Sequence, residues 1–373
     1  MKSLAKRFFS YIIIIICIIL LTACSKKISV KDQSIIHELE FGGVYVTLTI
    51  DEFNELGFEY GDSVNVSFSN GYSLNDIPYY NGYYTKNGEP LIVAYPGYEY
   101  IKVGINNGDD LFFKANLKED DTSSITLNKK GKYLDIQKAR DIHYYDDRTL
   151  YDSDAMFANF RAIKVTGLKD NTLYRSASPC DNQHNRASFV DELIKEANVN
   201  FILNLSDNET KINGYINNTG FNSPYFLSLY NDGKVCPIAL NMNYGSQEFK
   251  EKIASGLKEL IKHDGAYLVH CTEGKDRTGF VCMLLEALVG ASYEEIVNDY
   301  MITYYNYYRI DKDNEKQKYD VIVDNLLNPM IESIVLENVD YKKTSLESYA
   351  SLFLKNAGMS DEEISSLKDK LMN

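Results

Sequence analysis

The spacing of hydrophobic positions differs between two parts of the chain. From about residue 41 to residue 126, apolar residues alternate with polar ones, as at Val44, Val46 and Leu48. A period of two predicts strands with one buried face. Asn-Gly pairs, which favour tight hairpin turns, interrupt these runs at residues 70–71, 81–82, 87–88 and 107–108. We therefore expect a small antiparallel barrel or sandwich, followed by a polar linker over residues 118–132.

After residue 170 the pattern changes to short apolar runs between amphipathic segments. Residues 201–205 and 266–270 are predicted strands, and residues 246–263 and 278–288 are predicted helices. Capping residues mark three helix starts: Ser246, Ser292 with Glu295, and Ser360 with Glu363. Strands and helices in alternation predict an α/β fold, with a mostly parallel central sheet flanked by helices.

Composition narrows the possible functions. The 373 residues include 39 basic and 53 acidic side chains, which gives a formal net charge of -14. A chain this acidic, without a local basic stripe, is repelled by nucleic-acid phosphates, so nucleic acid is not an expected partner. The five His are scattered without metal-ligand spacing, and we expect neither a metal nor another cofactor.

The first 24 residues have the pattern of an export signal rather than of a folded domain. A basic segment over residues 2–7 precedes an apolar run over residues 11–21, which is short for a membrane-spanning helix. Leu21-Thr22-Ala23-Cys24 then resembles the lipobox of bacterial lipoproteins, in which the cysteine is lipidated and becomes the mature N-terminus. The resemblance implies a lipid anchor on the extracytoplasmic face of the cell membrane, with residues 25–40 as a tether. An uncleaved membrane anchor and a plain secretory signal are the alternatives.

Four further cysteines lie far apart along the chain: Cys180, Cys236, Cys271 and Cys282. The absence of any C-x-x-C pair argues against a zinc ribbon or a disulfide scaffold. A bridge between Cys180 and Cys236 remains open.

One strand–turn–helix unit contains the candidate chemistry. It reads His270-Cys271-Thr272-Glu273-Gly274-Lys275-Asp276-Arg277-Thr278-Gly279, and we call residues 271–277 the phosphate loop. The N–H groups of such a turn and the positive end of the following helix attract an anion, and a guanidinium grips two phosphate oxygens. The same field favours a thiolate, so Cys271 is predicted to attack phosphorus and form a phosphocysteine that water hydrolyses. Gly274 and Gly279 are positions where a Cβ would obstruct close packing.

Residues 270–279 resemble the H-C-x5-R-[ST] signature of cysteine-dependent phosphatases. The form H-C-x-A-G-K-D-R-T-G is that of bacterial tyrosine phosphatases with dual protein and phosphoinositide activity. The likeness includes Leu173-Tyr174-Arg175-Ser176-Ala177-Ser178 and the predicted helices over residues 349–371. It implies a tyrosine-phosphatase-like domain over residues 131–373, preceded by a β-rich domain over residues 41–130.

Two departures from the family pattern concern substrate choice more than reaction type. Glu273 replaces the family's Ala and places a second acid at the mouth of the loop. Asn204-Leu205-Ser206 stands where the family has D-L-R.

The resemblance also implies roles by position. Cys271 is the nucleophile, Arg277 binds the phosphate, and Thr278 hydrogen-bonds the departing thiolate while His270 orients the loop. Lys275 adds charge for a second phosphate or a lipid headgroup, the alternative being an ordinary solvated lysine. The side chains and backbone expected to hold the substrate's phosphate are those of Thr272, Glu273, Gly274, Lys275, Thr278 and Gly279.

The leaving group needs a proton, and a carboxylic acid near the loop can supply it. Asp276 is the first candidate, because some members of the family place their acid inside the turn. Asp207, after the strand over residues 201–205, is the second, and Asp232, in the loop over residues 231–233, is the third. Each is also a common turn or capping residue.

These observations predict a surface-anchored phosphatase for phosphomonoesters. The expected substrates are phosphotyrosine proteins, phosphoinositides or inositol phosphates, with the membrane as a second partner through the N-terminal lipid. The alternative is a non-catalytic surface lipoprotein that binds a phosphorylated or anionic ligand. Sulfur transfer also uses a cysteine in an anion-binding loop, but the run over residues 275–278 fits it poorly.

Overall fold

The computed structural model describes residues 28–39, 42–335 and 339–373. The predicted export signal and its lipobox, including Cys24, lie outside the described residues. Within the described ranges, no helix is both long enough and apolar enough to cross a membrane. The chain divides into two compact units, one formed mainly by residues before Leu134 and the other mainly by Leu134–Asn373.

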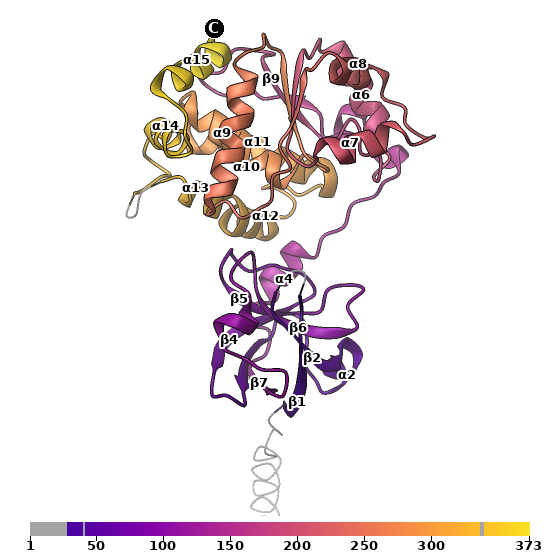
Figure 1. Cartoon of the computed structure of the whole chain (residues 1–373), viewed down its shortest axis with the longest axis vertical. Coiled ribbons are helices and arrows are strands. Elements are labelled where there is room, and N and C mark those ends of the chain that lie inside the picture. The colour runs from indigo at the N-terminus through magenta and orange to yellow at the C-terminus, as the bar shows by residue number, and fades with distance from the viewer. Residues whose placement is uncertain (1–27, 40–41, 336–338) are drawn as a thin grey trace, which may run out of the picture. The chain divides into compact units, whose positions relative to one another are not determined.

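The first unit contains a closed barrel, in which the described strands follow the order β1-β2-β6-β5-β4-β3-β7 (Figure 1). The strands are β1 Ser29–His37, β2 Val44–Thr49, β3 Ser63–Phe68, β4 Ser73–Tyr80, β5 Pro90–Val93, β6 Tyr100–Ile105 and β7 Thr122–Lys129, with two short helices, α2 Ile50–Glu55 and α3 Leu111–Lys114. Val44, Val46, Val64 and Val66 are buried in its interior. Their spacing confirms the predicted alternation.

Two strands of the barrel differ from the sequence-based expectation. Ser29–His37 was expected in the tether and forms β1, while Thr122–Lys129 was expected in the linker and forms β7. The two strands pair antiparallel with one another. Their polar composition concealed them, since β7 buries Ser123 as well as Ile125.

The Asn-Gly pairs mark turns, but only one of them connects a two-stranded hairpin. Residues 70–71 join β3 to β4, which pair antiparallel. Residues 81–82 and 87–88 lie between β4 and β5, which pair in parallel and therefore need a crossing connection. Residues 107–108 lead from β6 to α3.

The second unit is an α/β fold around a sheet whose described strands follow the order β11-β10-β12-β9-β8. The strands are β8 Arg161–Ala162, β9 Leu173–Ser176, β10 Phe201–Asn204, β11 Val235–Pro237 and β12 Tyr267–His270. Strands β9 to β12 run parallel, and β8 pairs antiparallel at one edge. The mostly parallel sheet is confirmed.

Helices cover both faces of this sheet. Figure 1 shows α6, α7 and α8 on one side and α9, α10, α14 and α15 on the other. The described helices of the second unit are α4 Leu134–Arg140, α5 Asp154–Phe157, α6 Ala187–Glu196, α7 Glu209–Ile216, α8 Pro224–Asn231, α9 Gln247–Leu260, α10 Asp276–Leu288, α11 Tyr293–Tyr308, α12 Lys316–Ile322, α13 Asn328–Glu332, α14 Glu347–Asn356 and α15 Asp361–Met372. A 3-10 turn, η1 Arg148–Leu150, and a π-helical turn, η2 Val323–Leu327, complete them. The predicted caps are confirmed: Ser246 caps α9, and both predicted capping boxes are formed.

Helix α10 is the central helix of the second unit. All its residues from Thr278 to Leu288 are buried, and most of them are apolar, as expected for a helix in the core. Because the phosphate loop runs directly into α10, the hydrophobic core fixes the loop's position. The thiols of Cys180 and Cys236 are both free, so the bridge left open from the sequence is not formed.

Candidate active site

The phosphate loop lies at the carboxyl edge of the parallel sheet. His270 ends β12, and Asp276 begins α10. The Cys271 side chain between them is almost fully buried. Because β9 and β10 run parallel to β12, the residues that follow them, Ser178 and Asp207, come to the same edge.

Three successive carbonyl groups of the loop accept hydrogen bonds from outside it. The backbone N–H of Ser178 donates to the Thr272 carbonyl at 3.0 Å. The Tyr307 hydroxyl donates to the Glu273 carbonyl at 2.7 Å, and the Arg175 guanidinium donates to the Gly274 carbonyl at 3.0 Å. In a trans peptide, the C=O of one residue and the N–H of the following residue point in opposite directions. The N–H groups of residues 273–275 therefore point away from the three donors that bind these carbonyls. Within residues 28–39, 42–335 and 339–373, the backbone N–H groups of residues 272–277 donate to no protein acceptor. The loop therefore presents amide donors on one side and is held from the other.

Glycine is required at both predicted positions. Gly274 has a φ of +68°, and a Cβ there would lie 2.2 Å from the carbonyl oxygen of Ser176. A Cβ on Gly279 would lie 2.7 Å from the ring of Tyr300. These contacts confirm the predicted close packing around the loop.

A buried ionic cluster supports the loop. Arg175 on β9 and Arg161 on β8 pair with the same carboxylate, Asp299 on α11, at 2.6 Å and 2.9 Å. Burial raises the pKa of Asp299, but the two guanidinium charges outweigh it and hold that pKa well below its usual range. Asn159 links the cluster to the loop, since it accepts from Arg161 at 2.9 Å and donates to the Gly274 carbonyl at 3.2 Å.

Two buried polar residues lie immediately next to the loop. The Nδ1 atom of His270 lies 3.2 Å from the carbonyl oxygen of Cys271 and donates to it in the Nδ1–H tautomer. Burial, only partly opposed by the charge of Asp207, lowers the pKa of His270 to about 4, so the ring is neutral at pH 7. Thr278 is fully buried, and its hydroxyl has no hydrogen-bond partner in the described part of the chain.

Arg277, the predicted phosphate clamp, lies in the first turn of α10. Its Nη2 atom is 3.3 Å from the Thr272 hydroxyl oxygen, and its Nη1 atom is 3.5 Å from the Leu240 carbonyl oxygen. Both contacts are long and therefore weak. They place the guanidinium beside the residue that follows Cys271.

The mouth of the loop contains an ion pair within the loop itself. The ammonium of Lys275 lies 2.9 Å from the Glu273 carboxylate and 3.8 Å from the Asp276 carboxylate, and it donates to the Tyr308 hydroxyl at 3.4 Å. The Lys275 side chain is only 18% exposed. Burial lowers its pKa, but the neighbouring negative groups, with Asp276 first, outweigh burial and raise the pKa well above its ordinary value. Lys275 is therefore a partnered cation rather than a solvated surface lysine.

Aromatic side chains flank this ion pair. The ring of Tyr144 stacks on that of Tyr307, with centroids 4.9 Å apart, and meets the edge of Tyr308 at 5.8 Å. His184 lies 5.5 Å from Tyr144. Burial, assisted by the charge of Glu273, raises the pKa of the Tyr144 hydroxyl far above its usual value, so this hydroxyl stays protonated.

The three candidate acids lie in different environments. Asp276 is the first residue of α10, and its side chain is 42% exposed at the mouth of the loop. Asp207 is buried, and both its carboxylate oxygens accept hydrogen bonds, at 3.2 Å from Tyr215 and 2.9 Å from Ser206. Asp232 precedes β11 and therefore lies at the amino edge of the sheet, away from the loop. The topology corrects the expectation that Asp232 belongs to a loop acting on this site.

Residues that support the loop from distant elements are missing from the sequence-based site. Asn159 and Tyr307 give no local signal, because each contacts the loop from more than 30 residues away in the chain. Asp299 gives none either, because it acts on the loop through Arg175, which is more than 100 residues away from it. Arg175 lies in the stretch that resembles the phosphatase family, but its place in the sequence does not indicate its contact with the Gly274 carbonyl.

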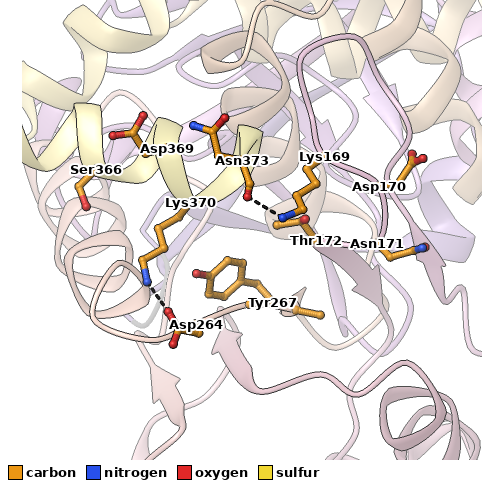
Figure 2. Close-up of a pocket in the computed structure, with 12 residues that line it drawn as sticks. Lys169, Asp170, Asn171, Thr172, Asp264, Tyr267, Ser366, Asp369, Lys370 and Asn373 are labelled. Atoms are coloured by element: carbon orange, nitrogen blue, oxygen red, sulfur yellow. Dashed lines mark hydrogen bonds and ion pairs between the residues drawn. The ribbon is translucent and has the colours of Figure 1, made fainter.

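A separate hollow of about 500 Å³ lies at the amino edge of the sheet, and Figure 2 shows its lining. Both lysines of its lining already have partners. Lys370 contacts Asp264 at 2.6 Å, and Lys169 donates to the carbonyl of Asn373 at 2.7 Å. No cluster of metal-ligating side chains occurs anywhere in the described ranges.

Comparison with known proteins finds similarity to tyrosine phosphatases in the C-terminal part of the chain. The family model described as "Tyrosine phosphatase family" matches residues 234–373, which include the phosphate loop and α10. A tyrosine-protein phosphatase from Nostoc commune is 52% identical over 42 residues, or 11% of this chain. The match spans 14% of that relative's length.

Two solved structures show low overall similarity. An uncharacterized conserved protein from Thermotoga maritima has a TM-score of 0.22 at 20% identity, over 26% of this chain and 35% of its own. The core catalytic domain of the PP-IP phosphatase SIW14 from S. cerevisiae, solved with citrate, has a TM-score of 0.25 at 18% identity, over 45% of this chain and 92% of its own.

Proposed function

We propose that the second unit hydrolyses phosphomonoesters through a covalent phosphocysteine at Cys271. The observation that carries this proposal is the orientation of the phosphate loop. Its carbonyls at residues 272–274 are engaged from outside, so its amide donors are free to converge on an anion beside the Cys271 thiol. The tyrosine phosphatase match over residues 234–373 supports the same chemistry.

In the first step the Cys271 sulfur attacks phosphorus, and the S–P bond forms as the ester P–O bond breaks. Loop amides and the Arg277 guanidinium stabilise the charge on the three non-bridging oxygens. The leaving oxygen takes a proton from Asp276, which is the candidate acid at the solvent-facing mouth. Asp207 is a poorer candidate, because its carboxylate already accepts hydrogen bonds on both oxygens.

In the second step water attacks phosphorus and the S–P bond breaks. The Asp276 carboxylate takes a proton from the water, and inorganic phosphate leaves. The departing thiolate needs a hydrogen-bond donor, and the buried, unpartnered hydroxyl of Thr278 is suited to that role. His270 keeps the start of the loop in place through the Cys271 carbonyl.

The decisive test is hydrolysis of para-nitrophenyl phosphate by the purified protein. We expect turnover that vanadate inhibits and that Cys271→Ser reduces by at least about 1,000-fold, because the nucleophile is lost. Binding of tungstate without any turnover would favour the alternative, a lipoprotein that binds an anionic ligand. Retained turnover in Cys271→Ser would contradict the phosphocysteine mechanism.

We further propose that a lipid on Cys24 tethers this activity to the extracytoplasmic face of the membrane. The support is the lipobox-like sequence over residues 21–24 after a basic and then an apolar segment. Cys24→Ala is expected to shift the protein from the membrane fraction to the soluble fraction. An unchanged membrane fraction for Cys24→Ala would contradict lipid anchoring at this residue.

A further inference from the structure

The charges at the mouth of the phosphate loop are largely balanced within the loop itself. The side chains of residues 273–277 include two carboxyl groups, Glu273 and Asp276, and two cations, Lys275 and Arg277. These groups sum to zero when Asp276 is ionised and to +1 when Asp276 is protonated for its role as the acid. The side chains of the loop therefore offer a substrate at most one net positive charge, which suits one phosphate rather than two.

Lys275 is the cation that a second phosphate on the substrate would need, and its charge is already paired within the loop. The ammonium contacts Glu273 at 2.9 Å, Asp276 at 3.8 Å and the Tyr308 hydroxyl at 3.4 Å. A further anion competes with Glu273 for this ammonium. The charge of Lys275 outweighs burial and lowers the pKa of Glu273, so the carboxylate stays charged at neutral pH and repels a second phosphate.

The surroundings of the ion pair favour an uncharged ring instead. The rings of Tyr144 and Tyr308 are partly exposed, and Tyr144 is held by stacking on Tyr307 at 4.9 Å. Aromatic faces and edges of this kind pack against another aromatic ring. An aryl phosphate presents such a ring together with a single phosphate.

We propose that Glu273 is a specificity determinant that holds Lys275 in an internal ion pair and so restricts the site to substrates with one phosphate. The inference rests on the proposed phosphatase function and narrows it to aryl phosphomonoesters. Substrates with neighbouring phosphates, whether lipid headgroups or free inositol phosphates, are turned over poorly.

The test compares two values of kcat/KM for each variant. One is for para-nitrophenyl phosphate, and the other is for a short-chain, water-soluble phosphatidylinositol bisphosphate with neighbouring ring phosphates. A parallel assay with inositol hexakisphosphate separates headgroup recognition from recognition of free inositol phosphates. We define the selectivity ratio as the aryl value divided by the bisphosphate value.

In Glu273→Ala the selectivity ratio is expected to fall at least tenfold, equivalent to about 1.4 kcal/mol, because Lys275 is released to bind the second phosphate. Glu273→Gln removes the charge with little change of shape and is expected to lower the ratio in the same direction. Adding Lys275→Ala to Glu273→Ala is expected to restore the wild-type ratio. Glu248→Ala is the matched control, since Glu248 on the surface of α9 also pairs with a lysine, Lys252, at 2.8 Å. This substitution is expected to leave the selectivity ratio unchanged.

An unchanged ratio in both Glu273 variants would overturn the inference, and so would a lowered ratio that persists after Lys275 is removed. Equal turnover of aryl phosphate and bisphosphate by the wild type would also overturn it. These failures leave the phosphatase function standing, because each of them requires turnover. Absence of turnover on every substrate would instead overturn the proposed function and this inference with it.

Discussion

The two edges of the α/β sheet differ in how their charged groups are used. At the amino edge, the hollow in Figure 2 is lined by polar and charged side chains near the surface, and its Lys370 pairs with Asp264. At the carboxyl edge, the backbone N–H groups of the phosphate loop have no acceptor in the described part of the chain, and a buried ionic cluster supports the loop. The difference shows that a hollow alone does not mark the candidate site. Unpartnered donors beside a buried thiol do so at the carboxyl edge.

The buried pairs at the carboxyl edge are expected to matter far more for stability than the exposed ones at the amino edge. Asp299→Asn leaves the guanidinium groups of Arg161 and Arg175 buried without a counter-charge, and we expect a loss of about 3–5 kcal/mol in the free energy of unfolding. Urea denaturation measures this loss in the free energy of unfolding. The matched control is Asp264→Asn at the amino edge, whose carboxylate is exposed to solvent and whose loss is expected to leave the midpoint unchanged. Equal effects of the two substitutions would remove the distinction between the edges.

Arg277→Lys tests whether the carboxyl edge binds phosphate through a planar fork. A lysine keeps the charge but loses bidentate geometry, so kcat for para-nitrophenyl phosphate is expected to fall about 100- to 1,000-fold. Lys370→Ala at the amino edge is expected to retain the wild-type rate. A fall in kcat of similar size in Lys370→Ala would show that the amino edge takes part in the reaction.

Asp276→Asn tests the proposed acid through the leaving group. For an alkyl phosphate, whose leaving group needs a proton, we expect kcat to fall about 100-fold. For para-nitrophenyl phosphate, whose leaving group is already stable as an anion, the fall is expected to be several-fold smaller. Steady-state kinetics on the two substrates measures the difference, with Asp207→Asn as the comparison. An equal fall on both substrates would show that Asp276 does not donate the proton.

The pH dependence of stability tests a further buried group, Glu286 of α10, which interacts with the Asp299 carboxylate. Burial, reinforced by the charge of Asp299, raises the pKa of Glu286 well above its ordinary value of 4.5. The folded protein therefore keeps a proton that the unfolded chain releases. The stability contributed by this group is complete below about pH 4.5 and declines as the pH rises, by up to about 1.4 kcal/mol per pH unit.

Glu286→Gln abolishes this titration. The variant is expected to gain stability relative to the wild type as the pH increases from about 5 to about 7. Urea unfolding at several pH values measures the gain. A difference in stability that stays constant with pH would mean that Glu286 titrates normally in the folded protein.

Local sequence patterns identified the elements that are built from nearby residues. The strands and helices around the phosphate loop follow from apolar runs and from caps such as Ser292 with Glu295, which act within one turn. Strands β1 and β7 were missed, because a polar strand is stabilised by its neighbours in the barrel rather than by its own composition.

The site shows the same division between local and long-range information. The residues of the phosphate loop are contiguous, so their chemistry is visible in the sequence. The support from Asn159 and Asp299 depends on contacts with residues more than 100 positions away. Asp232 was proposed from its loop context, but the direction of β11 decides which edge it occupies. Long-range contacts and the edge that a residue occupies can be predicted only when the topology of the sheet is known.

The most direct measurement of the central claim is to trap the covalent intermediate. The wild-type protein is mixed with a rapidly cleaved aryl phosphate, quenched in acid within milliseconds, digested and analysed by mass spectrometry. The account predicts one phosphoryl group on the peptide that contains Cys271, formed with burst kinetics and absent in Cys271→Ser. Turnover with an unmodified Cys271 peptide, or with phosphate on another residue, would contradict it.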